Sequence, residues 1–295
     1  MIRSLTSGIS GMQQFQQRLD VIGNNISNVN TSGFKSARVD FEDSFSQTIQ
    51  AASPGSANTS TVAGIQIGSG VSTGAIRNQF TQGAISRTGV QTDLAVSGEG
   101  FFVVRDPLTS AEYVTRSGDF RIDQNGYLIT NRGFRVQGFT DTATSKSGLS
   151  TIGDLEINMG TPPAGITPAP GATISSFAID LEGVVTVRLS DGNEYIRGQV
   201  LMQRFQDPQA LMKEGGNLYS GIGNAGPLGG AGSPTPQPPG SSGLGRIQSG
   251  AIELANVDLA SEFSAMITTQ RAFQASARII TTSDEILQEL VNLKR

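Results

Sequence analysis

The chain contains no cysteine, no histidine and no tryptophan. Without cysteine it can form neither disulfides nor thiolate metal sites. Without histidine it lacks the commonest general base, the usual activator of serine and cysteine nucleophiles, and the commonest metal ligand. These absences argue against most hydrolases and metalloenzymes, so we expect no enzyme activity, no cofactor and no bound metal.

Charge is also scarce in this sequence. Lys and Arg number 21 and Asp and Glu number 25, which together make 16% of the chain and a net charge of −4. Lys and Arg do not cluster, so a nucleic-acid partner is not expected. No apolar run approaches the roughly 18–20 residues of a membrane span, and the first thirty residues lack the apolar core of a secretory signal. The protein is therefore expected to stay out of the membrane, and either to remain in the cytoplasm or to leave by a route that reads no cleavable signal.

Apolar residues recur at helical spacing only near the two chain ends. The N-terminal stripe consists of Ile2, Leu5, Ile9, Met12, Leu19, Ile22, Ile26 and Val29. The C-terminal stripe alternates steps of three and four through Leu259, Phe263, Met266, Gln270, Phe273, Ala277, Ile280, Asp284, Leu287 and Val291. This second pattern predicts a helix over 256–293, capped by Asn256 or Asp258, with a seam of the coiled-coil kind. Because both ends carry a stripe, we expect the two helices to pair.

The stretch "NNISNVNTSGF" (24–34) places several amides on a predicted helix, although Asn is a poor former of helix interiors. One hypothesis is an ordinary helical hairpin with an Asn/Gln face toward solvent. The other, which we favour, is that this face packs against neighbouring subunits, since amides donate and accept hydrogen bonds without the desolvation cost of a charge. It assigns lattice hydrogen bonds to Asn24, Asn25 and Asn28. It assigns helix packing to Leu5, Ile9, Met12, Leu19, Ile22, Ile26, Phe263, Met266, Phe273, Ile280 and Leu287.

The middle of the chain alternates apolar and polar residues between turn signals, which is typical of β-strands. Asn125-Gly126 predicts a hairpin, and the spacing of Phe120, Ile122, Asp123 and Gly126 recurs at Phe177, Ile179, Asp180 and Gly183. The predicted fold class is α+β, a mostly antiparallel central β domain with terminal helices that pair as a coiled-coil-like inner domain. The predicted domains are 1–45 with 250–295 as the inner domain, 46–75 as an extended linker, and 76–249 as a β-rich outer domain. Segments 53–64, 160–173 and 225–245 are expected to be irregular, and the last is a Pro/Gly-rich loop.

Three short motifs match functional patterns, but their context favours a structural interpretation for each. "GIGNAG" (221–226) matches a dinucleotide fingerprint, but Pro227 and a Gly/Pro tract follow where a helix should open. Ser32 and Lys35 match S-x-x-K, yet the other elements of that catalytic set are missing or out of order. "PTPQPP" (234–239) is interpreted as a loop in preference to a ligand for a proline-binding module.

Three longer blocks resemble a known family. "LDVIGNNISNVNTSGFKSARVDFEDSFSQT" resembles the N-terminal signature of flagellar rod and hook proteins, and "DLAVSGEGFFVV" with "YVTRSGDFRIDQNGYLITNRGFRVQG" is similar to their central β module. "ANVDL" leading into "MITTQRAFQASARIITTSDEILQELVNLKR" is similar to their C-terminal helix. The resemblance covers about 1–139 and 174–295, with the blocks in the family's order.

The resemblance implies a structural subunit of the bacterial flagellum that forms a tube, with helices inside and β domains outside. It implies type III export to the hook and basal body outside the cytoplasmic membrane. The implied partners are further copies of the chain, neighbouring rod and hook–filament junction proteins, the export apparatus and the hook cap. The ending "TSDEILQELVNLKR" favours a short hook protein of the Gram-positive type, whereas the opening "MIRSLTSGISGM" and the modest length equally resemble a distal rod protein.

Two alternatives from other classes stay open at this point. One is a surface β-domain protein, such as an adhesin, on a helical stalk. The other is a hydrolase that uses Ser32 and Lys35.

Overall fold

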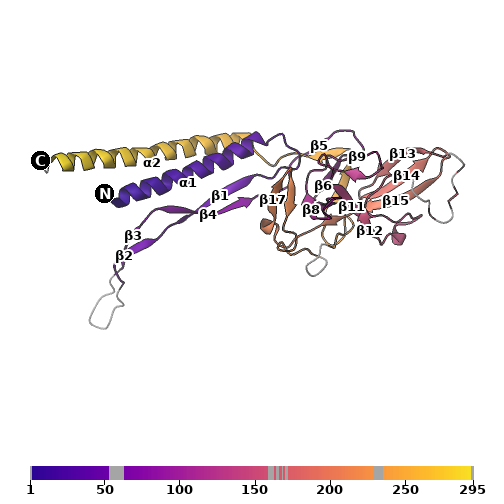
Figure 1. Cartoon of the computed structure of the whole chain (residues 1–295), viewed down its shortest axis with the longest axis horizontal. Coiled ribbons are helices and arrows are strands. Elements are labelled where there is room, and N and C mark those ends of the chain that lie inside the picture. Colours follow the sequence, from indigo (N-terminus) through magenta and orange to yellow (C-terminus); the bar gives the residue numbers. More distant parts are fainter. Residues whose placement is uncertain are drawn as a thin grey trace. The chain divides into compact units, whose positions relative to one another are not determined.

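The computed structural model describes residues 2–52, 63–158, 163, 166, 167, 169, 172–228 and 235–293. The contacts divide the chain into two compact units (Figure 1). The first, here called the helical unit, comprises residues 1–29, 36–79 and 257–295. The second, here called the β unit, comprises residues 30–35 and 80–256.

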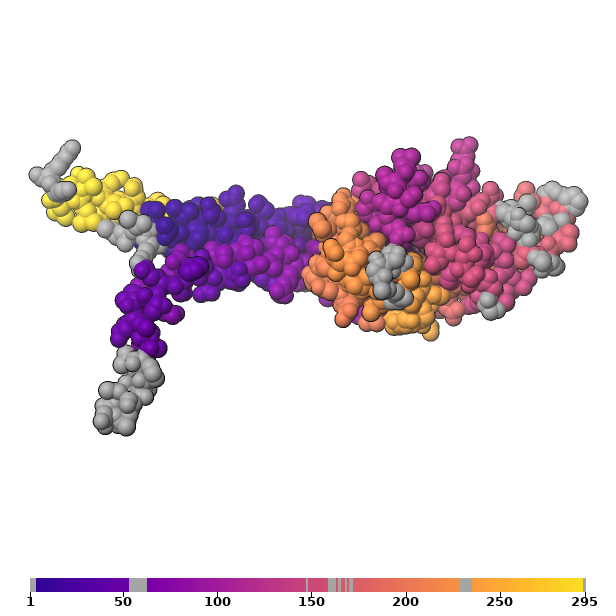
Figure 2. Space-filling view, turned by 60° about the horizontal axis from the view of Figure 1, so that its bottom comes forward, coloured from indigo at the N-terminus to yellow at the C-terminus, as the bar shows by residue number. Residues whose placement is uncertain are grey.

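The helical unit combines two long helices with a two-stranded ribbon. Its elements are α1 (Ile2–Ser27), α2 (Leu259–Leu293), β1 (Ala37–Asp43), β2 (Ser46–Gln50), β3 (Ile65–Gly68) and β4 (Val71–Asn78). Antiparallel pairing of β1 with β4, followed by β2 with β3, makes one continuing ribbon. Figure 2 shows the violet part of this ribbon formed by β1 and β4 beside the indigo helix α1.

The start of α2 confirms one of the two predicted caps. Asp258 Oδ1 accepts the backbone N–H of Ala260 at 2.9 Å and that of Ser261 at 3.3 Å. Asp258 is therefore the N-cap, because its side chain satisfies amides that have no partner inside the helix. The helix begins at Leu259, three residues later than the predicted start at 256.

The described parts of 46–75, the segment for which an extended linker was predicted, lie in this ribbon. These parts, 46–52 and 63–75, contain β2, β3 and the start of β4. Apolar and polar residues alternate only weakly in this stretch, because both faces of β2 and β3 are exposed and neither has to be apolar. The prediction of an irregular segment over 53–64 falls mostly on residues outside the described ranges.

The β unit is built from short strands. They are β5 (Ile85–Arg87), β6 (Leu94–Ser97), β7 (Phe101–Arg105), β8 (Glu112–Thr115), β9 (Arg121–Ile122), β10 (Leu128–Ile129), β11 (Arg135–Phe139), β12 (Ile152–Asp154), β13 (Ile174–Ile179), β14 (Val184–Leu189), β15 (Glu194–Val200), β16 (Met202–Gln203), β17 (Met212–Gly215), β18 (Leu218–Ser220), β19 (Arg246–Ser249) and β20 (Ala251–Glu253). Two short 3₁₀ turns lie at Lys146–Gly148 and Pro208–Ala210.

A twelve-stranded antiparallel sheet dominates the β unit. Its main path runs β13-β14-β15-β11-β7-β8-β18-β17, and β9, β10, β12 and β16 pair beside it. Two further pairs, β6 with β19 and β5 with β20, join early strands to the last two. The expected α+β class with a mostly antiparallel β domain is confirmed.

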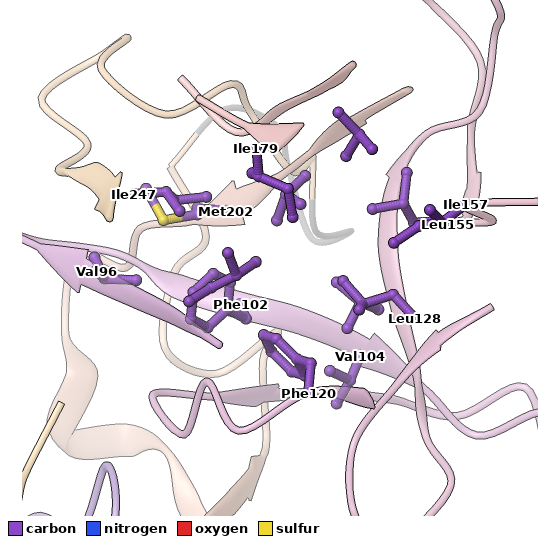
Figure 3. Close-up of a cluster of buried hydrophobic side chains, with 14 of the residues drawn as sticks. Val96, Phe102, Val104, Phe120, Leu128, Leu155, Ile157, Ile179, Met202 and Ile247 are labelled. Atoms are coloured by element: carbon purple, nitrogen blue, oxygen red, sulfur yellow. The ribbon is translucent and has the colours of Figure 1, made fainter. Parts of the chain in front are cut away.

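The core of the β unit is apolar and closed. Phe102, Val104 and Leu128 are fully buried, and the rings of Phe102 and Phe120 meet edge to face at 5.1 Å. Figure 3 shows these side chains converging with Met202 and other residues from several strands. This burial supplies the main stabilisation of the unit, at about 25 cal/mol for each Å² of apolar surface removed from water.

The repeated spacing noted in the sequence marks one type of turn. Asp123 Oδ1 accepts the amides of Asn125 and Tyr127, and Asp180 Oδ1 likewise accepts those two and four residues further on. Gly126 and Gly183 sit at φ +91° and +74°, which glycine adopts without strain. Both aspartates therefore act as turn formers.

Candidate assembly surfaces

The contact between α1 and α2 is made by small residues. In α2, Thr269, Ser276 and Ser283 are buried at intervals of seven residues. In α1, Gly8 and Gly11 face Ser276, and a Cβ added at Gly11 would lie 3.3 Å from Ser276 Oγ. We call these five residues the small-residue seam. A Cβ added at Gly8 would lie 3.4 Å from the side chains of Ile279 and Ile280, so the absence of a side chain at this position lets α2 pack closely against α1.

The seam runs one residue away from part of the predicted stripe. The sequence pattern placed Gln270, Ala277 and Asp284 toward α1, but the buried positions are the residues just before them. Other residues of the predicted stripe are partly covered: Met266, Phe273 and Ile280 are half-buried. A search for apolar residues alone overlooks Thr and Ser, whereas Ser/Thr at heptad spacing opposite paired glycines was a signal available in the sequence.

Several predicted packing residues of the helices face outward. Phe263 is 49% exposed, Ile9 39% and Leu287 37%. Leu5, Met12, Leu19 and Ile26 are half-buried, and Ile22 is buried. Further exposed apolar side chains of α2 are Ile267, Ile279, Ile286, Leu290, Val291 and Leu293. Together the exposed side chains of both helices form what we call the outward apolar surface, an arrangement that leaves much apolar area for another partner.

Asn25 acts inside the chain. Its amide accepts the backbone N–H of Ala37 at 3.0 Å and donates to the carbonyl of Ala37 at 2.9 Å and to Glu262 Oε1 at 3.2 Å. Only 1% of the residue is exposed. The side chain thereby joins α1, β1 and α2, and it is not free for the lattice hydrogen bonds predicted for it.

Asn24 and Asn28 lie elsewhere on the same helix end. Asn24 is exposed, and Asn28 Nδ2 donates to both the backbone carbonyl and Oδ1 of Asn24 at 2.9 Å. These two amides still present polar atoms at the surface. Their predicted lattice role stays a prediction.

The ribbon packs on α1 through one aromatic contact and several polar ones. Phe15 and Phe41 meet edge to face with ring centroids 6.0 Å apart. Thr73 Oγ1 lies 2.6 Å from Gln17 Oε1 and also bonds Gln14. Part of the uncharged polar coat of α1 is therefore used on its own ribbon.

A buried ion cluster lies in the β unit. Lys35 Nζ is 2.7 Å from both Glu253 Oε1 and the carbonyl of Thr81, and Arg116 Nη1 is 3.3 Å from Glu253 Oε2. The side chains of Lys35 and Glu253 are completely buried. Burial lowers the pKa of Lys35, and the charge of Glu253 acts against that shift. The cluster joins residue 35, near the start of the β unit, to residue 253, near its end.

The backbone around this cluster depends on Gly33. Its N–H donates to the carbonyl of Glu253 at 2.7 Å, and its φ is +67°. A Cβ at this position would lie 2.5 Å from the amide nitrogen of Ser117. The "TSGF" turn therefore requires glycine for both conformation and space.

The predicted S-x-x-K pair has other partners. The ammonium group of Lys35 is held by Glu253 and Thr81, while Ser32 Oγ lies 3.3 Å from Ser117 Oγ. A serine nucleophile needs an adjacent free base, and this lysine is bound in an ion pair. "GIGNAG" likewise ends in a turn and a bridge at Pro227.

Within the described ranges, no three His, Cys, Asp or Glu side chains lie close enough together to hold a metal ion. Across the same residues, no helix combines the length and apolarity needed to cross a bilayer.

Family profiles match three parts of the chain. "Flagella basal body rod protein" matches residues 5–35, "Flagellar hook protein FlgE/F/G D1 domain" matches 95–187, and "Flagellar basal body rod FlgEFG protein C-terminal" matches 248–293. The N-terminal segment, part of the β unit and the C-terminal segment are thus matched by three separate family profiles, in the order of the chain.

Curated relatives align over the whole length. The flagellar basal-body rod protein FlgG of Bacillus subtilis is 42% identical over 295 residues, covering 100% of both chains, and that of Borreliella burgdorferi is 36% identical over 297 residues, also covering 100% of both. The flagellar hook protein FlgE of Borreliella burgdorferi is 29% identical over an alignment of 449 residues that covers 100% of both chains. The chain belongs to the family of flagellar axial rod and hook proteins, and it is a structural subunit of the bacterial flagellum.

Proposed function

We propose that this chain is a subunit of the distal rod, which was the alternative to the hook in the sequence analysis. The observation that carries the proposal is the end-to-end alignment with rod proteins of nearly equal length. The alignment with the hook relative is 449 positions long, although this chain has 295 residues. The hook relative therefore contains a large insertion that this chain lacks.

In this proposal the helical unit forms the inner tube. Phe263, Ile267 and Leu287 are exposed in the single chain, and their burial between copies would stabilise a helical lattice. The small-residue seam keeps α1 and α2 together as one helix pair, which we call a ridge of the inner tube. Asn24 and Asn28 are the amides that we assign to contacts between ridges.

The ribbon supplies stiffness in the same proposal. Phe45 is 87% exposed, and Ile49 and Ile65 are 59% and 52% exposed. An isolated two-stranded ribbon with apolar side chains on both faces is only marginally stable in water. Packing these side chains against neighbouring copies would hold the ribbon rigid and resist bending of the tube.

The task of the protein is mechanical and not enzymatic in this proposal. The chain leaves the cytoplasm through the flagellar type III apparatus and polymerises with itself. Its other contacts are with neighbouring rod and hook proteins. Torque passes through many modest interfaces repeated along the lattice.

Immunogold electron microscopy on hook–basal bodies of the source bacterium tests the position. An antibody raised against residues 80–228 should label the tip of the rod, directly or after outer parts are stripped. Label along the curved external segment would instead assign the protein to the hook. Absence of label from both places would contradict an axial role.

A further inference from the structure

A line of charged side chains runs along the side of α2 that faces away from α1. Its members are Arg271, Arg278, Glu285 and Glu289, and all four are exposed. The first three each lie two positions after a buried seam residue of α2. Two positions correspond to roughly 200° around a helix of about 3.6 residues per turn, so these residues lie opposite the seam. Glu289 follows about one turn after Glu285, and we call the four residues the charged line.

These charges have no counter-charge within the described part of the chain. None of the four side chains forms an ion pair with another described residue. Ion pairs along one helix join residues three or four positions apart, and those positions hold no opposite charge for any member of the line. Glu285 and Glu289 are four positions apart and repel each other. The single chain therefore leaves two arginines and two glutamates to the solvent.

Charge is segregated along α2. Between Phe263 and Ser283 the helix carries no charge except the two arginines of the line, whereas its last turns are acidic. Two such helices that lay side by side, parallel and at the same height, would bring like charges together. If one is displaced along the common axis, its acidic end comes beside the basic middle of the other.

The spacing of the charges gives the size of this displacement. Glu285 lies 14 positions after Arg271, and Glu289 lies 11 positions after Arg278. At about 1.5 Å per residue these separations amount to roughly 16–21 Å. Because arginine side chains are long, one displacement within this range places each arginine beside a glutamate of the neighbouring helix.

The same displacement covers apolar surface. Figure 1 shows α2 continuing past the first residues of α1, so the last turns of α2 have no helix beside them among the described residues. Leu290 and Leu293 of these turns are exposed, and so is Ile279 next to Arg278. The two leucines lie 11 and 14 positions after Ile279, which are the separations found for the charges. Burial of these side chains between copies adds to the attraction of the charges.

The direction of the helices decides whether the contact can extend. An antiparallel pair would also match arginines with glutamates, but it is symmetric and closes at two copies. A parallel, displaced pair leaves the glutamates of one copy and the arginines of the other available for further copies. Such a heterologous contact continues along a polymer, as an axial structure requires.

We propose that the charged lines of neighbouring copies pair with each other, Arg271 of one copy with Glu285 of the next and Arg278 with Glu289. The α2 helices are then parallel and displaced by roughly 16–21 Å. This proposal rests on the proposed function, because it needs a polymer whose copies all point the same way. It adds to that function the contact that fixes the axial register of the inner tube.

An exchange of charges within one chain tests this contact. Full-length variants replace the natural protein in the source bacterium, and the amount of chain in isolated basal bodies is compared with the amount in whole cells. Arg271→Glu and Glu285→Arg should each lower incorporation about tenfold or more, because like charges then meet at every such contact. The double variant Arg271→Glu/Glu285→Arg restores opposite charges between copies and should recover most of the natural incorporation.

The matched control is the double variant Arg271→Glu/Asp284→Arg. Asp284 is exposed and lies one position before Glu285, which is about 100° around the helix and off the charged line. This variant has the same net charge as the exchange, yet it should incorporate as poorly as Arg271→Glu alone. Equal recovery by both double variants would overturn the proposal, and so would failure of the exchange to recover or normal incorporation of Arg271→Glu.

All of these outcomes leave the proposed function intact, provided that the natural chain is found in basal bodies. Absence of the natural chain from them would overturn the proposed function and this contact with it.

Because the chain contains no cysteine, a thiol cross-link measures the displacement directly. Gln274 and Gln288 are exposed, lie beside the charged line and are 14 positions apart. Basal bodies that contain Gln274→Cys/Gln288→Cys should give, with a short bismaleimide, a ladder of three and more joined chains. Neither single variant should cross-link. A product that stops at two chains would indicate the antiparallel pair, and cross-linking of Gln274→Cys alone would indicate helices at the same height; either result, or no product, would overturn the proposal.

Discussion

The two units of this chain distribute their apolar side chains in opposite ways. The β unit buries Phe102, Val104 and Leu128 completely, and it also buries the ion pair of Lys35 and Glu253. The helical unit buries Thr269 and Ser276, while Phe263 stays half exposed. The first therefore has what it needs to fold alone, whereas the second reserves its apolar side chains for other chains.

The largest effect on folding should come from the choice of end points for a fragment that contains the β unit. A fragment of residues 30–256 keeps Gly33, Lys35 and Glu253, and we expect it to unfold cooperatively. A fragment of residues 36–252 loses Lys35 and Glu253 and leaves Arg116 buried without its carboxylate, so it should not fold stably. Thermal unfolding followed by circular dichroism distinguishes the two. Equal melting curves would show that the ends are dispensable.

Glu253→Ala should destabilise the β unit by about 3–5 kcal/mol, because it leaves two buried cations without their partner. Glu253→Gln keeps an oxygen for the amide of Gly83 and should cost less. Urea unfolding of the 30–256 fragment measures both. A loss below 1 kcal/mol in the alanine variant would contradict the role assigned to the buried ion cluster.

Asp154→Asn should cost about 1–3 kcal/mol, since Asp154 pairs with Arg105 at 2.7 Å and Arg135 at 2.9 Å. Burial acts to raise the pKa of Asp154, but hydrogen bonds from Gln137, Arg135 and Arg105 outweigh it and lower the pKa. The stabilisation is therefore complete above the unfolded pKa of about 3.9 and is lost as pH falls through the lower folded value.

Unfolding free energies measured across pH 2–7 should show the natural chain and the Asp154→Asn variant converging at the acid end. Glu194→Gln is the control. Its pair with Arg188 spans 3.5 Å between largely exposed side chains and should contribute at most about 0.5 kcal/mol. A gap between the Asp154 variant and the natural chain that widens as pH falls would contradict the sign of this shift.

Asn25→Ala sharpens the contrast inside the helical unit. The amide of Ala37 loses its acceptor, and we expect its hydrogen exchange to accelerate about tenfold or more. Asn24→Ala removes an exposed amide of the same helix and should leave that exchange rate unchanged. Similar rates in both variants would contradict the assignment of Asn25 to the fold.

The smallest effect on the single chain should come from Phe263→Ser. Because Phe263 is half exposed, its replacement should change monomer stability by no more than about 0.5 kcal/mol. Incorporation into basal bodies should nevertheless fall sharply, whereas Gln274→Ser, at an exposed polar position, should incorporate normally. A destabilised monomer with normal incorporation would reverse the contrast between the units.

Much of this architecture could be predicted from local signals. Helical spacing identified both terminal helices, and Asn125-Gly126 identified a hairpin, because those patterns act over a few residues. The helix contact was partly missed, since it depends on Ser276 facing Gly8 and Gly11 of a distant segment. The ion cluster could not be predicted either, because Lys35 and Glu253 are 218 positions apart and nothing local pairs them.

The joining of the two ends of the β unit has a consequence for how it bears load. Gly33 bonds Glu253 and Phe34 bonds Asn256, so the two segments run in the same direction. Opposed pulls on residues 30 and 256 would slide them past each other and strain all these bonds at once, in contrast to peeling, which breaks one bond after another. Tension applied between residue 30 and residue 256 can pass directly through the bonds of Gly33 with Glu253 and of Phe34 with Asn256, without loading the strands of the sheet. Single-molecule pulling from these two residues should give one high rupture force, and early stepwise unravelling of the sheet would contradict it.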